Sequence, residues 1–267
     1  MAMTYKPKMR TRERILSFGV QGVGKSNAIL TVARKCPDVT FYVIDTDYSE
    51  SYARALDSEY EGLENVEITR VSPDDWENMI PAIDAINAKM GVDDWLIFDS
   101  MSPTWEAVQE WFIERVHGQS IDDYFMDVRM KKENTKGKDS KALGALEGWM
   151  DWPVINKVYF RLYKQLMATP GHLYMTAEQV AVNDDEGREI KGLFGPYGVK
   201  PRGQKKLGHL PQTVLLFTKN RAGEYAITTI KDRNRAELES QPIEDFMRDY
   251  MVKIAGWRPT KLEVDGE

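Results

Sequence analysis

The segment FGVQGVGKS, residues 18–26, contains the residue types that bind phosphate. Gly19, Gly24, Lys25 and Ser26 complete the pattern G-x-x-x-x-G-K-[ST] between an apolar run and an amphipathic one. Glycines let the backbone curl so that its N–H groups point at phosphate oxygens, and the following helix N-terminus adds a favourable dipole. The alternative is a glycine turn that only joins a strand to a helix.

In this pattern the lysine neutralises the β and γ phosphates of a nucleotide, and the serine hydroxyl binds Mg²⁺. The pattern therefore predicts a site for ATP and Mg²⁺. The residues expected to contact the nucleotide here are Gly19, Val20, Gln21, Gly22, Val23, Gly24, Lys25, Ser26 and Asn27.

A phosphate loop with magnesium needs a carboxylate at the end of a neighbouring strand. Asp99 follows the apolar residues of WLIFDS (95–100), and we expect it to orient the ion through a bound water, with Ser26 as the second metal residue. The alternative is that Asp99 caps the next helix, because Ser100 and Ser102 are close by.

The elements that must position these residues alternate along the chain. Strands are expected over 15–19, 39–45, 66–71, 95–100 and 172–178, and helices over 25–35, 49–56 and 74–90, the last interrupted or kinked at Pro81. Residues 213–220 and 224–232 predict a hairpin closed around Ala222 and Gly223, and 242–256 predict an amphipathic helix. Apolar strands separated by helices predict an α/β fold with a mainly parallel sheet flanked by helices.

The chain of 267 residues predicts one domain over 14–256, preceded by a basic leader (1–13) and followed by a tail (257–267). Two long stretches lack a clear period and are rich in basic residues, at about 131–148 and 183–208. We expect both to be flexible loops within the domain.

Two further segments resemble the RecA recombinase family. VIDTDYSESYARAL (43–56) is similar to the family's segment with the catalytic glutamate and an adenine-stacking tyrosine, and LIFDSMSPTWEA (96–107) to its magnesium-binding strand. With the phosphate loop, the resemblance covers residues 14 to about 235, and it is strongest to the short RecA-like ATPases of bacteriophages. It implies a RecA-like P-loop NTPase core with a C-terminal hairpin.

The resemblance also implies roles for single residues. Asp47 takes the place of the glutamate that activates the attacking water, although it is one methylene shorter; Glu50 and Glu178 are the fallback candidates. Tyr52 resembles the adenine-stacking tyrosine, with a buried core aromatic as the alternative. Gln179, or else Thr176, takes the position that senses the γ-phosphate.

Lys231 and Arg233 match the family's cations that reach the γ-phosphate of a neighbouring subunit. Hydrolysis would then depend on a homo-oligomer, a ring or a filament, with ATP at its subunit interfaces. The alternative is a solvated run of charge.

The net charge is −6, so contact with nucleic acid must come from local basic segments. The two basic loops fall where the family keeps its DNA loops, with Phe194 and Tyr197 able to stack on bases, and solvated loops as the alternative. The candidate residues for single-stranded DNA are Lys131, Lys132, Lys136, Lys138, Lys200, Arg202, Lys205 and Lys206. The leader cations could contact DNA or a neighbouring subunit.

Composition excludes several classes of site. A single cysteine, Cys36, allows no intrachain disulfide, and three scattered histidines do not suggest a zinc cluster. There is no apolar run of membrane-spanning length and no signal-peptide pattern, so we expect a cytoplasmic protein, in the host cytoplasm if phage-encoded, with no membrane partner.

Together these features favour a Mg²⁺-dependent, DNA-stimulated ATPase that assembles on single-stranded DNA and promotes annealing or strand exchange in phage recombination or replication. One alternative is a ring-forming helicase or DNA-packaging motor. Another is a switch that binds ATP with little hydrolysis, which the aspartate at position 47 would suit.

Overall fold

The computed structural model describes residues 12–46, 50–134, 151–233, 235 and 240–257, and it contains a nine-stranded sheet. The strand order is β3-β2-β4-β5-β1-β7-β8-β9, with the short β6 paired to β5. The strands are β1 (Arg14–Gly19), β2 (Phe41–Asp45), β3 (Val66–Arg70), β4 (Trp95–Asp99), β5 (His172–Ala181), β6 (Val199–Pro201), β7 (Thr213–Lys219), β8 (Tyr225–Asp232) and β9 (Gln241–Pro242).

The neighbouring strands from β3 to β7 are parallel to one another, and β8 and β9 add an antiparallel edge. β1, β2 and β4 are buried along their whole length, which accounts for their near-continuous apolar sequences. β7 and β8 form the expected hairpin. The predicted α/β fold, with a mainly parallel sheet and a C-terminal hairpin, is therefore confirmed.

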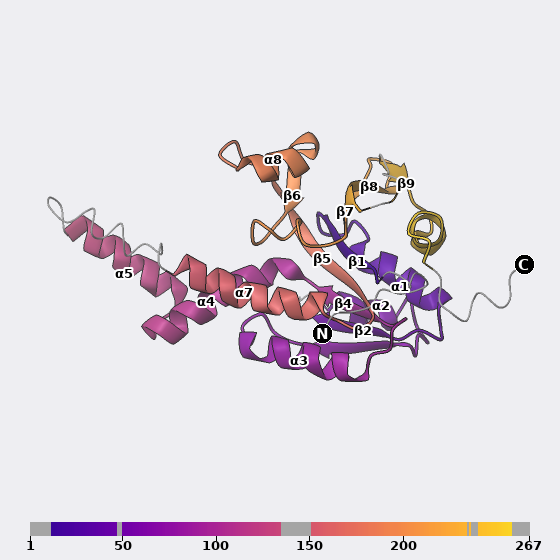
Figure 1. Cartoon of the computed structure of the whole chain (residues 1–267), viewed down its shortest axis with the longest axis horizontal. Helices are drawn as coiled ribbons and strands as arrows, with labels where there is room; N and C mark the ends of the chain where they lie inside the picture. Colours follow the sequence, from indigo (N-terminus) through magenta and orange to yellow (C-terminus); the bar gives the residue numbers. More distant parts are fainter. Residues whose placement is uncertain (1–11, 47–49, 135–150, 234, 236–239, 258–267) are drawn as a thin grey trace, which may run out of the picture.

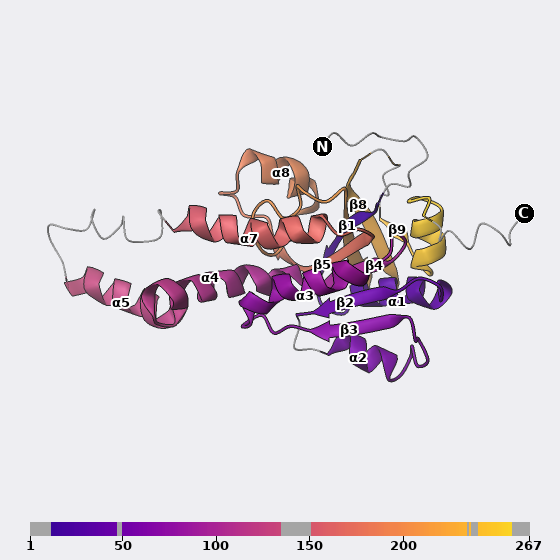
Figure 2. The same cartoon turned by 60° about the horizontal axis from the view of Figure 1, so that its bottom comes forward.

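Helices cover both faces of this sheet (Figures 1 and 2). One buried cluster joins the sheet to α3, α4, α7 and α8, and the other joins it to α1, α2 and the C-terminal turn η2. The helical elements are α1 (Lys25–Lys35), α2 (Ser51–Leu56), α3 (Trp76–Lys89), α4 (Met101–His117), α5 (Ile121–Asn134), α7 (Trp152–Met167), α8 (Arg188–Phe194), the 3₁₀ turn η1 (Gly195–Tyr197) and the π-helical turn η2 (Met247–Val252). α3 continues through Pro81, so the predicted interruption of this helix is not observed, and a kink at Pro81 stays a prediction.

The stretch 183–208 is not the structureless loop that its composition suggested. It contains α8, η1 and β6, and β6 pairs with the end of β5. Phe194 is buried and its ring meets that of Phe18 edge to face at 5.9 Å, so it cannot stack on a DNA base. The apolar anchor explains why a segment with so many basic residues still folds.

Residues at both ends of the described chain pack into the core. Glu13 is buried and pairs with Arg235 at 2.9 Å, and Arg14 donates hydrogen bonds to the carbonyls of Thr169 and Gly171 beyond the end of α7. Trp257 is buried against Trp95, so the first residue of the predicted tail packs into the core. Residues 1–11 and 258–267, with the leader cations Lys6, Lys8 and Arg10 and the rest of the tail, lie outside the described residues.

Candidate active site

The turn between β1 and α1 has the conformation that a phosphate loop requires. Gly22 and Gly24 have φ values of 74° and 85°, in the left-handed region that favours glycine. A Cβ atom on Gly19 would lie 2.4 Å from the carbonyl oxygen of Phe217, so β7 leaves no space for a side chain there. Gly22 and Gly24 therefore serve the turn itself, and Gly19 allows the close approach of β7.

Lys25 is the first residue of α1, and its side chain folds back over this turn. Its Nζ donates hydrogen bonds to the carbonyls of Gly19 at 3.0 Å and Val20 at 2.9 Å. The ammonium group is thereby held inside the curve of the turn. It lies where it could neutralise a bound anion.

Ser26 and Asp99 meet although they are far apart in the sequence. Ser26 Oγ donates a 2.7 Å hydrogen bond to Asp99 Oδ2, and Thr176 Oγ1 donates one to Asp99 Oδ1. Asp99 ends β4 and is only 6% exposed, and Thr176 comes from the adjacent β5. The structure thus places the two predicted metal residues together, at the carboxyl edge of the sheet.

The hydroxyl and the carboxylate suit Mg²⁺, a hard cation that takes oxygen ligands and keeps several waters. The glycine turn likewise suits a phosphate group, because no atom lies within 4 Å of where a Cβ on Gly22 would stand, so the turn is open to a ligand there. Ser26 and Asp99 would hold the ion, and the turn with Lys25 would hold the phosphates.

A cavity of about 400 Å³ opens above these residues. Its walls come from the glycine turn, the starts of α1 and α4, and the ends of β4 and β5. The charged and polar groups that face it include Gln21, Lys25, Asp99, Glu106, Glu178 and Arg202. The cavity brings the glycine turn, the cations Lys25 and Arg202 and several carboxylates together in one space.

Glu178, one of the two fallback carboxylates, lies in this cavity. Its Oε1 accepts a hydrogen bond from Gln21 Nε2 at 3.2 Å, and its Oε2 pairs with Arg202 Nη1 at 2.9 Å. Gln179 is the next residue on β5 and is not among the residues that line the cavity. Its contact with the nucleotide stays a prediction, whereas Thr176 lines the cavity.

The position of Arg202 differs from the one that we predicted from the sequence. Besides Glu178, its Nη2 contacts Glu106 Oε1 of α4 at 2.5 Å, and hydrogen bonds to the two carboxylates raise the pKa of the guanidinium above its usual value. We expected it to bind DNA, but it lies in the cavity beside the phosphate loop. Nothing near position 202 signals this, because the contact depends on β6 pairing with β5.

The other candidate base residues lie elsewhere. Asp47 is outside the described residues. Glu50 pairs with Arg70 at 2.9 Å and lines a separate hollow beside β3. Of the two candidate base residues that the structure describes, Glu178 is the one that faces the cavity.

Tyr52 does not present its ring to a ligand. Its side chain is 0% exposed and belongs to the core cluster under α1. The adenine-stacking role is therefore wrong, and the alternative of a core aromatic fits. Its burial follows from its place in α2, which packs on the sheet through this residue.

Lys231 and Arg233 lie away from the cavity. β8 is antiparallel to β7, so Lys231 comes close to the first residues of β7, far along the sheet from the phosphate loop. Its Nζ donates hydrogen bonds to the carbonyls of Gly208 at 3.1 Å and His209 at 2.8 Å, and burial together with Arg233 lowers its pKa to about 8. Arg233 is exposed. A role on a neighbouring subunit stays a prediction.

The cations of the second basic stretch have different surroundings. Lys200 pairs with Glu186, and both side chains are largely buried, which does not suit contact with DNA. Lys205 and Lys206 are exposed. Of this group, these two remain accessible to a nucleic acid.

The first basic stretch is described only in part. Lys131 and Lys132 lie in the last turns of α5, which projects away from the sheet (Figures 1 and 2). Lys136 and Lys138 lie outside the described residues. Their contact with DNA stays a prediction.

Comparison with protein-family models and with curated proteins gives no match. Among solved structures, the chain is similar to the RadB recombinase, with a TM-score of 0.46 and 14% identity over 84% of this chain and 83% of the other. It is also similar to an ATP synthase subunit, NeqB from Nanoarcheaum equitans, with a TM-score of 0.41 and 10% identity over 78% of this chain and 47% of the other. No helix of the described residues has the length and apolar character needed to cross a bilayer.

Proposed function

We propose that the protein is a Mg²⁺-dependent ATPase whose nucleotide binds in the cavity above β1, β4 and β5. The observation that carries the proposal is that Lys25, Ser26 and Asp99 line one cavity. The glycine turn would supply N–H groups for the phosphates, and the hydrogen bond from Ser26 to Asp99 supports a magnesium site at these two side chains. Hydrolysis of the γ-phosphoryl group requires in addition a group that positions the attacking water.

Glu178 and Asp47 are the candidates for that group. Glu178 faces the cavity and is held by Gln21 and Arg202. A carboxylate in this position could accept the proton of the water, while Arg202 would stabilise the charge that develops on the transferred group. Asp47 keeps the role implied by the family resemblance.

We further propose that the ATPase assembles as a homo-oligomer on single-stranded DNA and promotes annealing or strand exchange, as a phage recombination or replication protein. Two features of the chain support DNA coupling. Arg202 joins the cavity to the folded segment 183–208, and Lys205 and Lys206 of the same segment are exposed. A change at the γ-phosphate could therefore be passed to a basic surface only a few residues away.

The test is phosphate release from MgATP at low salt, with and without single-stranded DNA. The proposal predicts turnover that rises on addition of DNA and falls to background in Lys25→Ala. Lys157→Ala, which removes an exposed charge from α7, is the matched control and should retain turnover. If Lys25→Ala retained full turnover, the proposed ATPase site would be refuted. If DNA did not change the turnover, only the proposed recombinase role would be refuted.

One observation favours a second function, a switch that binds ATP with little hydrolysis. The carboxylate of Glu178 is already engaged by Arg202 and Gln21, which would restrain it from activating water. Tight ATP binding with phosphate release near zero would support the switch. In that case Arg202→Ala should raise turnover by freeing the carboxylate.

A further inference from the structure

The helix α5 carries an apolar surface that the rest of the described chain leaves open. The helix packs on the core through Ile121 and Tyr124, whereas the side chains of Phe125, Met126 and Met130 are 51%, 63% and 58% exposed. Single exposed apolar side chains are ordinary, but three within one short stretch of helix are typical of an interaction site. Because α5 projects away from the sheet, another molecule can reach this surface (Figures 1 and 2).

Two opposite charges flank the centre of the same surface. Asp122 and Arg129 are both exposed and lie seven residues apart, about two helical turns, so they share one face of α5. Phe125 and Met126 lie between them on that face, since each is three or four residues from either charge. Two turns rise about 10 Å, so Asp122 and Arg129 of one chain do not pair with each other. Within the described ranges neither residue forms an ion pair.

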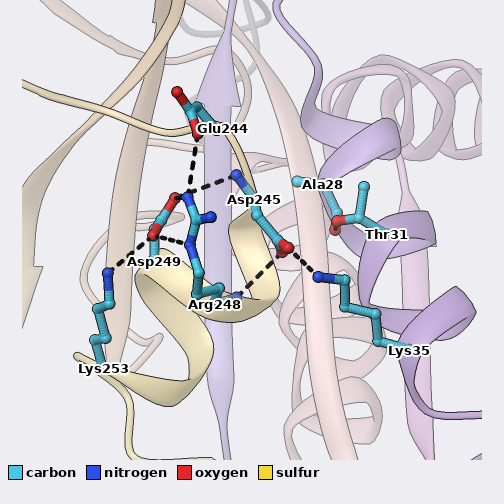
Figure 3. A network of polar contacts seen from close by, with 8 residues as sticks. All are labelled: Ala28, Thr31, Lys35, Glu244, Asp245, Arg248, Asp249 and Lys253. Carbon is cyan, nitrogen blue, oxygen red and sulfur yellow. Dashed lines mark hydrogen bonds and ion pairs between the residues drawn. The ribbon is translucent and has the colours of Figure 1, made fainter.

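The contact between η2 and α1 shows how charges are arranged where two helical segments of this chain do pack together (Figure 3). Asp245, just before η2, pairs with Lys35 of α1. Asp249 pairs with Arg248 at 2.7 Å and with Lys253 at 3.1 Å. The charges on the open face of α5 have no such partners among the described residues, which leaves them available to a second molecule.

The order of residues along α5 makes this face complementary to itself. The midpoint between Asp122 and Arg129 falls between Phe125 and Met126. When a second copy lies antiparallel, with a two-fold axis through this midpoint, Asp122 faces Arg129 of the partner subunit, and Arg129 faces the partner subunit's Asp122. The apolar side chains of the two copies then meet at the centre. A parallel pair would instead place like charges opposite each other.

We propose that α5 is a dimerisation helix that pairs antiparallel with α5 of a second copy of this chain. The apolar side chains form the centre of the contact and the two ion pairs form its rim, which is the usual arrangement of a protein interface. The contact uses no residue of the cavity above the phosphate loop, so it does not need nucleotide. It goes beyond the proposed ATPase and does not rest on it. A single helix pair buries a small area, so the dimer is weak and its population rises with protein concentration.

Charge reversal tests the pairing. Sedimentation is measured over a concentration series without nucleotide for wild type, Asp122→Arg, Arg129→Asp and an equimolar mixture of the two variants. Each variant alone places like charges opposite each other twice, so its dimer dissociation constant should rise at least about tenfold. The mixture should dimerise again, because one copy then carries two arginines and the other two aspartates. Glu61→Arg, which reverses an exposed charge outside α5, is the control and should dimerise like wild type.

Two further variants test the centre of the contact. Phe125→Ala should weaken the dimer about tenfold, with circular dichroism to confirm that the helix is retained. Met126→Cys should form disulfide-linked dimers on oxidation with copper phenanthroline, since the two thiols lie beside the two-fold axis. Val92→Cys, at a residue that is 69% exposed and outside α5, should not. The native Cys36 is buried and leaves this readout clear.

The outcomes separate the dimer from the nucleotide site. Wild-type protein that stays monomeric throughout the series would overturn the proposal, as would a mixture no more dimeric than its separate components. A dimer that persists in both charge reversals would use another surface and would also overturn it. Lys25→Ala should dimerise as wild type does. Loss of nucleotide binding with the dimer retained would therefore count only against the ATPase site, and MgATP binding by a monomeric wild type would count only against the α5 contact.

Discussion

Ser26 Oγ lies 2.7 Å from Asp99 Oδ2, and this hydrogen bond joins the start of α1 to the end of β4. The contact is possible because β4 and β1 both border β5, so their carboxyl ends meet at one edge of the sheet. In a nucleotide complex these two side chains would help to hold a magnesium ion. The central feature of the site is thus a contact produced by sheet topology.

Asp99→Asn tests the metal role. The amide keeps the shape of the side chain but removes the negative charge, so the affinity for Mg²⁺ and the turnover should both fall, the latter by about 10²–10³-fold. The measurement is phosphate release as a function of magnesium concentration. Thermal unfolding is the control, since Asp99 also accepts a hydrogen bond from Thr176. An unchanged magnesium dependence in a folded variant would contradict the assignment.

Glu178→Gln tests the base. If Glu178 positions the water, turnover falls by about 10²–10⁴-fold while MgATP still binds. Glu106→Gln is the matched comparison, because Glu106 contacts the same Arg202 but comes from α4. A much smaller effect in that variant is expected. Equal turnover in Glu178→Gln and wild type would exclude Glu178 and leave Asp47 as the candidate.

Gly22→Ala tests the conformation of the phosphate loop. Gly22 has φ +74° and no atom near a substituted Cβ, and Gly62, outside the loop, has φ +85° and the same open space. Each alanine should lower the free energy of unfolding by about 1–2 kcal/mol, the cost of left-handed backbone. Only Gly22→Ala should also weaken MgATP. If Gly62→Ala weakened MgATP as much, the effect would be one of stability alone.

The lowered pKa of Lys231 predicts that the free energy of unfolding depends on pH. Its pKa is lowered from the usual 10.5 to about 8 in the folded chain, first by burial and then by Arg233. Between about pH 8 and 10.5 the unfolded chain therefore binds more protons, and Lys231 makes the free energy of unfolding rise with pH in this window. In Lys231→Met that contribution should disappear, as measured by urea unfolding of both proteins across the window. Identical slopes would show that the lysine titrates normally.

Much of the fold follows from the sequence pattern. The apolar runs that became β2 and β4 are buried in full, as expected for parallel strands covered on both faces. The stretch 183–208 could not be predicted in the same way, because its order depends on distant contacts. Phe194 packs on Phe18, and β6 pairs with β5.

The candidate site likewise contains residues that the sequence predicts and residues that only the tertiary structure places there. The glycine turn, Lys25, Ser26 and Asp99 form a local motif and a strand end, which the sequence displays directly. Arg202 lies in the site because of a tertiary contact with Glu178, which the sequence does not display. Tyr52 lies outside the site because α2 buries it against the sheet. Glu178 ends the strand predicted over 172–178, and in the structure it lies within β5, which runs to Ala181.

The most direct measurement of the central claim is calorimetric titration of MgATP into the protein and into its Lys25→Ala and Lys157→Ala variants. The account predicts one nucleotide per chain for wild type and Lys157→Ala, and no detectable binding when the ammonium group of Lys25 is removed. Equal binding by Lys25→Ala and wild type would contradict it, as would wild-type protein that shows no heat with MgATP.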